Sequence, residues 1–328
     1  MRRHPRGFSL VETMIAMVLG LLLLAATTRL FLLQRRVFRL TDALGRLQET
    51  GRFALELLAR DVRMAGLRGC AGSGPVRIDA SPPAAAGFPG TAVTGHEGGA
   101  APDRLTVRRA ATRAAPLARD MASPWSPVAL AANPGGIGHG DLVLVADCAG
   151  ADVFRVTSDP PRRGAASLAH LATGNRDARL RAAYRRPVTG RVPGARVSRL
   201  LVHRYSITDT GRRNPRGGRV TALARNGHDL FEGVETMQLR FGVSRAGQPV
   251  RYLPADRVTR WKGVVAVRVG LLLRSRAPLR SDPDRRIYRV AGTRVGPPGA
   301  GTPVHHPADH RLRRVMTATV ALREPELP

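Results

Sequence analysis

Three histidines near the C-terminus form the densest group of side chains that could bind a metal ion. His305, His306 and His310 lie in a proline-rich segment, where Asp309 is the adjacent carboxylate and no cysteine is near. Structural zinc sites draw on four Cys or His ligands, and catalytic sites on three ligands plus water. The sequence therefore favours an exposed loop here, and we predict no metal site.

Other short motifs do not complete a catalytic arrangement. The glycine-rich residues 135–140 are not followed by Lys-Ser/Thr and do not open a helix, as a phosphate-binding loop would require. Asp120, Asp147 and Asp152 lie around Ser123 but follow no known catalytic order, and no nucleophile elbow is present. We therefore predict that the chain is not an enzyme and needs no cofactor.

The two cysteines, Cys70 and Cys148, have neither the CxxC spacing nor the nearby histidine pattern of a zinc or redox motif. If this part of the chain is exported, a disulfide between them is the natural interpretation. The bridge would tie the end of a long helix to a strand and restrict the unfolded chain by roughly 2–4 kcal/mol. Two separate free thiols are the alternative.

A carboxylate, Glu12, lies near the start of a long apolar segment. No residue from Thr13 to Thr28 is charged, and apolar residues resume after Arg29. The segment is about long enough to cross a bilayer core of roughly 30 Å. A plain membrane anchor gives no reason for a carboxylate, whose burial in lipid is costly.

The flanks of this segment set its orientation and distinguish it from an ordinary secretory signal. A secretory signal would be cut behind the apolar stretch, near Ala25 and Ala26. The residues that precede it are basic, and the positive-inside tendency keeps them cytoplasmic and exports the rest of the chain. These basic residues are Arg2, Arg3 and Arg6.

Residues 7–12, Gly-Phe-Ser-Leu-Val-Glu, resemble the prepilin cleavage motif of type IV pilins and type II secretion pseudopilins. The resemblance implies that prepilin peptidase cuts after Gly7 and methylates the new amino terminus of Phe8. Glycine at the junction lets an enzyme approach the backbone closely. Glu12 would lie one helical turn from that amine, where it could offset the positive amine of a neighbouring subunit in an apolar bundle.

Three further segments resemble the PilW family of minor pilins: residues 51–66 with Gly69 and Cys70, residues 230–243, and residues 311–315. Residues 71–195 show no specific resemblance to this family. The resemblance implies a low-abundance subunit that primes or caps pilus assembly, with other major and minor pilins as partners. It also implies a single-pass inner-membrane protein that contacts lipid through its N-terminal helix, with a periplasmic head and the option of incorporation into the pilus.

A long helix is expected to follow the cleavage site. We expect residues 1–7 to form a leader peptide, 8–33 the transmembrane or filament-core helix, and 34–69 its amphipathic continuation, with stop signals at Gly66 and Gly69. A solvent-exposed coiled coil has less support, because the heptads are few and glycines weaken it. The continuation carries an apolar stripe with a spacing of three or four residues: Val37, Leu40, Leu44, Leu47, Gly51, Ala54, Leu58 and Val62.

Residues 70–328 read as a β-rich head with proline- and glycine-rich loops at 81–102, 160–194 and 277–307. Strands follow one another without helical patterns between them, which favours an antiparallel sheet. We predict an α+β, pilin-like fold in which that sheet packs on the C-terminal half of the long helix. The predicted strands are 104–109, 141–147, 153–156, 198–207, 220–225, 234–243, 264–273, 287–290 and 315–322.

The formal charge is +29, and all but one of the 53 basic residues are arginine, Lys262 being the exception. This charge favours polyanions such as nucleic acid or anionic lipid. The arginines are spread along the chain, however, and aromatic residues that could stack on bases are only 4%. A solvated basic surface is the preferred interpretation, and DNA contact ranks below it. A minor pseudopilin of type II secretion is the first alternative to a pilus subunit, and a DNA-contacting head is less favoured than either.

Overall fold

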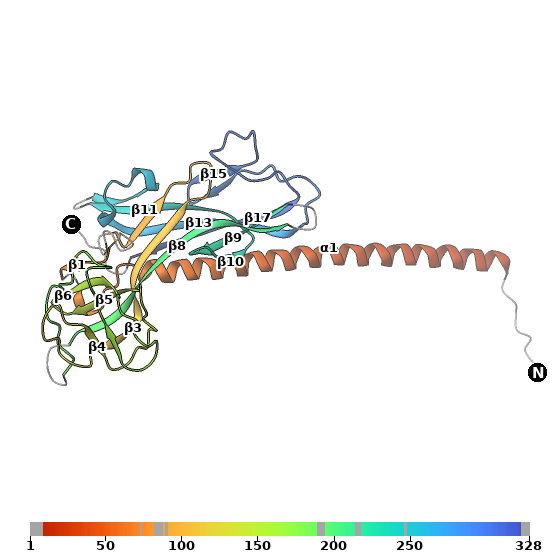
Figure 1. Ribbon diagram of the computed structural model, residues 1–328. Helices are drawn as coiled ribbons and strands as arrows, with labels where there is room; N and C mark the ends of the chain where they lie inside the picture. The colour runs from red at the N-terminus through yellow and green to blue at the C-terminus, as the bar shows by residue number, and fades with distance from the viewer. Residues whose placement is uncertain are drawn as a thin grey trace, which may run out of the picture.

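The computed structural model describes residues 9–72, 74–81, 88, 91–188, 194–213, 218–245 and 248–322. One long helix, α1 (Leu10–Arg63, 54 residues), projects from a head made of β-strands (Figure 1). At about 1.5 Å per residue this helix is about 80 Å long. The predicted cleavage residues Gly7 and Phe8 lie outside the described residues.

The apolar stripe of α1 is divided between two environments. Leu47, Leu58 and Val62 are buried against the head, whereas the Val37 side chain is 61% exposed. The helix ends at Arg63, slightly before the expected stop at Gly66, whose φ of +79° lies in the left-handed region that favours glycine. Figure 1 shows the first half of α1 extending away from the head.

The largest sheet has eight strands in the order β1-β6-β5-β8-β3-β2, with β9 on β8 and β10 on β9. The long strand β8 pairs with β3 along one edge and with β5 and then β9 along the other. The bounds are β1 (Val76–Ile78), β2 (Val93–His96), β3 (Arg104–Pro116), β5 (Leu142–Asp147), β6 (Gly150–Arg155), β8 (Arg196–Arg213), β9 (Arg219–Arg225) and β10 (His228–Glu232).

A four-stranded antiparallel sheet, in the order β12-β11-β13-β17, packs on the C-terminal half of α1. Its strands are β11 (Val234–Arg245), β12 (Gln248–Leu253), β13 (Val264–Pro278) and β17 (Arg311–Ala321). Two small sheets complete the head: β14 (Tyr288–Val290), β15 (Thr293–Gly296) and β16 (Val304–His305) in one, and β4 (Val128–Leu130) and β7 (Ala166–Leu168) in the other. Short 3-10 helices are η1 (Gly69–Ala71), η2 (Ala255–Arg257) and η3 (Trp261–Gly263).

The main hydrophobic core joins α1 to both large sheets, through residues such as Leu58 of the helix, Tyr205 of β8 and Leu271 of β13. A second core, around Phe154 and Leu168, lies in a separate lobe. This lobe is formed by strands β4 to β7 together with the segment near Tyr184. The head is therefore larger than the part that holds the helix, and in Figure 1 the lobe lies at the end of the head farthest from the N-terminus.

The predicted α+β fold class is confirmed, and each predicted strand segment overlaps an observed strand. The expectation of one sheet was too simple, because the strands divide among several sheets. Four strands also lie in segments expected as loops: β2, β7, β15 and β16. Each has at most four residues, too few for an alternating pattern to stand out among prolines and glycines.

Gly51 lets α1 approach the four-stranded sheet closely. A Cβ at this position would lie 2.2 Å from Met316 Sδ and 3.1 Å from Leu273 Cδ1, whereas one at Gly45 would meet nothing within 4 Å. We expect Gly51→Leu to lower the free energy of unfolding by about 1–3 kcal/mol through overpacking. The control Gly45→Leu, on an exposed part of the same helix, should raise helix stability slightly because leucine replaces glycine.

Denaturant unfolding of the full chain in detergent, followed by a head tyrosine or tryptophan signal, measures both variants. Equal stability of the two leucine variants would contradict the proposed close packing at Gly51.

Candidate assembly site

The first turn of α1 carries the carboxylate singled out by the sequence. Glu12 is exposed in the first turn, where a negative charge interacts favourably with the helix dipole. Ser9 precedes the helix in an extended conformation, and Thr13 N donates to Ser9 O at 3.1 Å. The Thr13 hydroxyl donates to Leu10 O at 2.8 Å, so it does not pair with Glu12 in this geometry. The carboxylate therefore stands on the helix surface and is accessible to a second charged group.

The surface around Glu12 is apolar over many turns. Within the described residues, α1 is the one helix long and apolar enough to span a membrane, and that part of it is not buried in the head. Its exposed large apolar residues are Leu10, Val11, Met14, Ile15, Met17, Val18, Leu19, Leu21, Leu22, Leu23, Leu24, Leu30, Phe31, Leu32 and Leu33. This apolar helix fits membrane anchoring, and a carboxylate within it requires a partner charge wherever water is excluded.

At the other end, α1 is fixed to the head by the carboxylate of Asp61, which is 2% exposed. Tyr205 OH of β8 donates to Asp61 Oδ2 at 2.5 Å, and Arg109 Nη2 of β3 donates to Oδ1 at 3.2 Å. His203 Nδ1 also contacts Oδ2, and Arg225 Nη1 of β9 lies 4.0 Å from it. Three strands of the eight-stranded sheet thus direct polar side chains at one helical residue.

The electrostatics of this cluster favour an ionised Asp61. Burial by itself raises the pKa of the carboxyl, but hydrogen bonds from His203 and Tyr205 and the charges of His203 and Arg109 lower the pKa to about 2. The Tyr205 phenol, buried beside this carboxylate, has its pKa raised above its usual value. Sequence reasoning missed this cluster. The available signal was the position of Asp61, seven residues after Ala54 and three after Leu58, which places it on the buried stripe.

Two of the three histidines considered as metal ligands contact backbone carbonyl oxygens instead. His306 is buried, with Nε2 2.9 Å from Arg286 O and Nδ1 2.9 Å from Pro307 O, while His310 Nδ1 lies 3.1 Å from Arg280 O. His305 is exposed at the end of β16. Among the described residues, no group of three or more His, Cys, Asp or Glu side chains has a geometry that could hold a metal ion.

The aspartates considered near Ser123 accept hydrogen bonds at turns and strand ends, and Arg181 contacts two of them, Asp147 and Asp152. Asp120 accepts from Arg186 N at 2.8 Å, and Asp152 accepts from Tyr184 OH at 2.6 Å. Asp147 accepts from the backbone of Gly150 at 2.9 Å. Ser123 pairs with Ser126 at 3.0 Å. These contacts hold turns and strand ends, so the structure does not bring the four residues together.

Cys70 and Cys148 form a disulfide with a Cα–Cα distance of 4.7 Å. Cys70 lies in η1, just after α1, and Cys148 lies in the tight turn between β5 and β6. The bridge closes a sequence separation of 78 residues. It therefore ties the end of the helix to the β5–β6 hairpin, as the sequence predicted.

Two family models match the chain at the two ends of this arrangement. The prokaryotic N-terminal methylation motif matches residues 2–28, and the type IV pilus-assembly protein W family, PilW, matches residues 200–324. The resemblance to PilW is thereby confirmed. The PilW match spans most of β8 and all strands from β9 to β17, including the four-stranded sheet that packs on α1. The search of curated proteins and the search of solved structures give no significant match.

The head should owe part of its acid sensitivity to Asp61. Because its folded pKa is lowered from 3.8 to about 2, the stabilisation is present above pH 4 and lost as the pH falls towards 2. We expect wild type to lose about 2 kcal/mol more than Asp61→Asn over this interval. Urea unfolding at several pH values measures the difference, with Asp42→Asn, an exposed carboxylate of the same helix, as the control. If the free energy of unfolding changed with pH in the same way for wild type and Asp61→Asn, this role of Asp61 would be ruled out.

Loss of the disulfide should destabilise the head by about 2–4 kcal/mol, because the unfolded chain regains the freedom of a long loop. Either Cys70→Ser or Cys148→Ser already breaks the bridge, so the double variant should be no less stable than the singles. Thermal unfolding of the three variants tests this non-additivity. Two titratable thiols in wild-type chain purified from its native membrane would contradict the bridge.

Proposed function

We propose that this chain is a minor pilin that primes or caps assembly of a type IV pilus after cleavage by prepilin peptidase. The observation that carries the proposal is the division of α1: its C-terminal half is locked on the head, and its N-terminal half presents an apolar surface with a single carboxylate in the first turn. The matches to the methylation motif and to PilW support the same function.

In this proposal, prepilin peptidase removes residues 1–7 and methylates the amine of Phe8. The new chain start carries a positive charge close to an apolar surface, and transfer of an unpaired charge out of water is costly. Glu12 of an adjacent subunit, held on the first helical turn, supplies the compensating charge. Helices in the bundle can then associate through apolar contact only in registers that bring amine and carboxylate together.

The size of the head supports a place at an end of the filament. The lobe with the Phe154 and Leu168 core adds bulk beside the sheets that hold α1, outside the segment matched by the PilW model. A repeating subunit is surrounded by neighbours on all sides, whereas a terminal subunit has open space for a large head. Low abundance and a priming or capping role follow from such a position.

The description of the matched family favours a pilus over a type II secretion machine, because it is a type IV pilus-assembly protein. The disulfide supports an oxidising compartment for the head, which suits the periplasm. With the basic N-terminal flank in the cytoplasm, the chain would cross the inner membrane once and exchange lipid contacts for contacts with other pilins on assembly.

We expect Glu12→Ala to leave the head folded and reduce pilus number at least about tenfold, as loss of a paired charge in an apolar setting would imply. Glu56→Ala, at an exposed site of the same helix, is the matched control and should assemble normally. Electron microscopy counts pili in strains that carry each variant as the single copy, and immunoblotting verifies equal amounts of protein.

Two results would contradict the proposed function. One is normal piliation with Glu12→Ala. The other is normal piliation in a strain whose single copy carries a Gly7 substitution that blocks cleavage.

A further inference from the structure

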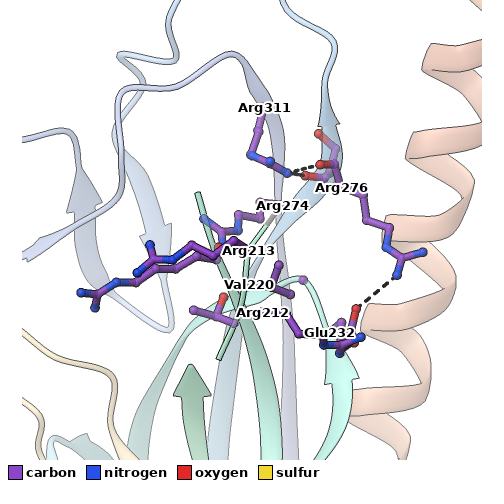
Figure 2. A pocket seen from close by; sticks show the side chains of 11 residues that line it. Arg212, Arg213, Val220, Glu232, Arg274, Arg276 and Arg311 are labelled. Carbon is purple, nitrogen blue, oxygen red and sulfur yellow. Dashed lines mark hydrogen bonds and ion pairs between the residues drawn. The ribbon is translucent and has the colours of Figure 1, made fainter. Parts of the chain in front are cut away.

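An arginine-lined cavity of about 270 Å³ opens where α1 leaves the head. Its wall is formed by the end of β8, the start of β9, the β10–β11 turn, the end of β13 and the start of β17. Figure 2 shows Arg276 reaching to Glu232 on the side of the cavity nearest α1. We call this cavity the arginine pocket, after the arginines that line it: Arg212, Arg213, Arg219, Arg274, Arg276 and Arg311.

Two of these arginines form a buried floor. The side chains of Arg274 and Arg311 are about 90% buried. Arg311 Nη1 donates to Ser275 O at 2.5 Å and also to Arg276 O, while Arg274 pairs with Glu235 at 3.4 Å and donates to Arg219 O. Their guanidinium groups are therefore held in place by backbone carbonyls before any ligand arrives.

The rim is built from exposed arginines around one carboxylate. Glu232 holds Arg276 at 3.3 Å through one oxygen and Arg212 through the other. The side chains of Arg276 and Arg219 are 79% and 71% exposed. A guanidinium has five N–H donors, and one Arg276 nitrogen contacts Glu232 here, so further donors face the solvent at the mouth.

Six arginines and one carboxylate, Glu232, line the pocket. Three of these arginines also pair with carboxylates outside the lining: Arg274 with Glu235, Arg219 with Asp209 and Arg311 with Asp309. Burial, followed by the nearby charge of Arg274, lowers the pKa of Arg311, while the charges of Asp309 and Glu235 act in the opposite direction. Thr221 also lines the pocket, although its Oγ1 is inaccessible to solvent and makes no hydrogen bond within the described part of the chain. Several guanidinium groups around one cavity form a donor set that suits an anion with several oxygens.

We propose that the arginine pocket binds a phosphate group. Arginine forks pair with phosphate oxygens in a bidentate manner. The arginines of this pocket come from four strands, β8, β9, β13 and β17, an arrangement that fits a tetrahedral anion better than a planar carboxylate. The buried Arg274 and Arg311 supply fixed charge at the floor, and Arg219 and Arg276 close over the outer oxygens.

The position of the pocket makes a lipid headgroup one source of this phosphate. Glu232, Arg274 and Arg276 also line a groove of about 560 Å³ that runs along α1 past Arg39 and Arg46. If residues 8–33 span the bilayer, Arg39 lies about 9 Å beyond the span along the helix. The headgroup source rests on the membrane anchoring in the proposed function, whereas binding of a free phosphate anion does not.

The experiment is calorimetric titration of the full chain in a neutral detergent with inorganic phosphate, and separately with dioctanoyl phosphatidylglycerol. The variant R219Q/R276Q removes two exposed rim charges. The control R251Q/R257Q removes two exposed charges from β12 and η2, which the pocket does not include. We expect R219Q/R276Q to weaken binding at least about tenfold, the loss that accompanies removal of a charge-assisted hydrogen bond, with no change in the control.

Each outcome decides the matter. Tighter binding of phosphatidylglycerol than of inorganic phosphate supports the pocket and assigns it to headgroups, and the reverse order supports it with a free phosphate ligand. Equal weakening in both variants, equal binding of acetate, or no binding by wild type would overturn the proposal. None of these results depends on cleavage at Gly7, so a failure here is distinct from a failure of the pilin assignment.

Discussion

One continuous helix must satisfy two apolar environments, and the other features of the chain follow from this constraint. The C-terminal half of α1 buries its stripe in the core shared by both large sheets. The N-terminal half presents a run of leucines that the head does not cover. Burying one large apolar side chain contributes about 1.5–3 kcal/mol, so this half gains considerably from lipid or from neighbouring helices. Within the described residues, the chain therefore does not supply the apolar partner that this half requires.

The head ensures that the free half of α1 points in a defined direction. Apolar contact alone would tolerate small rotations of the helix, but Asp61 has directional partners on three strands, and Gly51 allows close approach to the four-stranded sheet. The disulfide adds a covalent tie immediately after the helix. A helix fixed in this way keeps its apolar half at a set orientation to the head, which a flexible linker could not do.

The sequence predicted the parts that depend on local pattern. The apolar stripe located the helix, and alternating runs such as those of β11 and β13 located the long strands. It also predicted the pairing of Cys70 and Cys148, because two cysteines leave a single intramolecular pairing. The apolar stripe did not show that burial against the head begins only near Leu47. The same periodicity is expected for a helix that packs on a head and for one that packs on neighbouring subunits.

What the sequence could not predict depends on contacts between distant segments. His203 and Tyr205 are 142 and 144 residues from Asp61, and nothing local to either segment marks the pair. The arginine pocket draws on several strands, and in a chain with so many arginines its members carried no distinguishing signal. Likewise, the histidines looked like ligands in sequence, and only tertiary structure revealed that His306 and His310 bind backbone carbonyls.

The most direct test of the account is mass spectrometry of the N-terminal peptide of the mature chain, purified from its native membrane. A chain that begins with N-methylated Phe8, with α1 retained behind it, is the predicted result. A chain that keeps residues 1–7, or one cut near Ala26 so that the apolar half of α1 is lost, would contradict the claim that this helix is an assembly element.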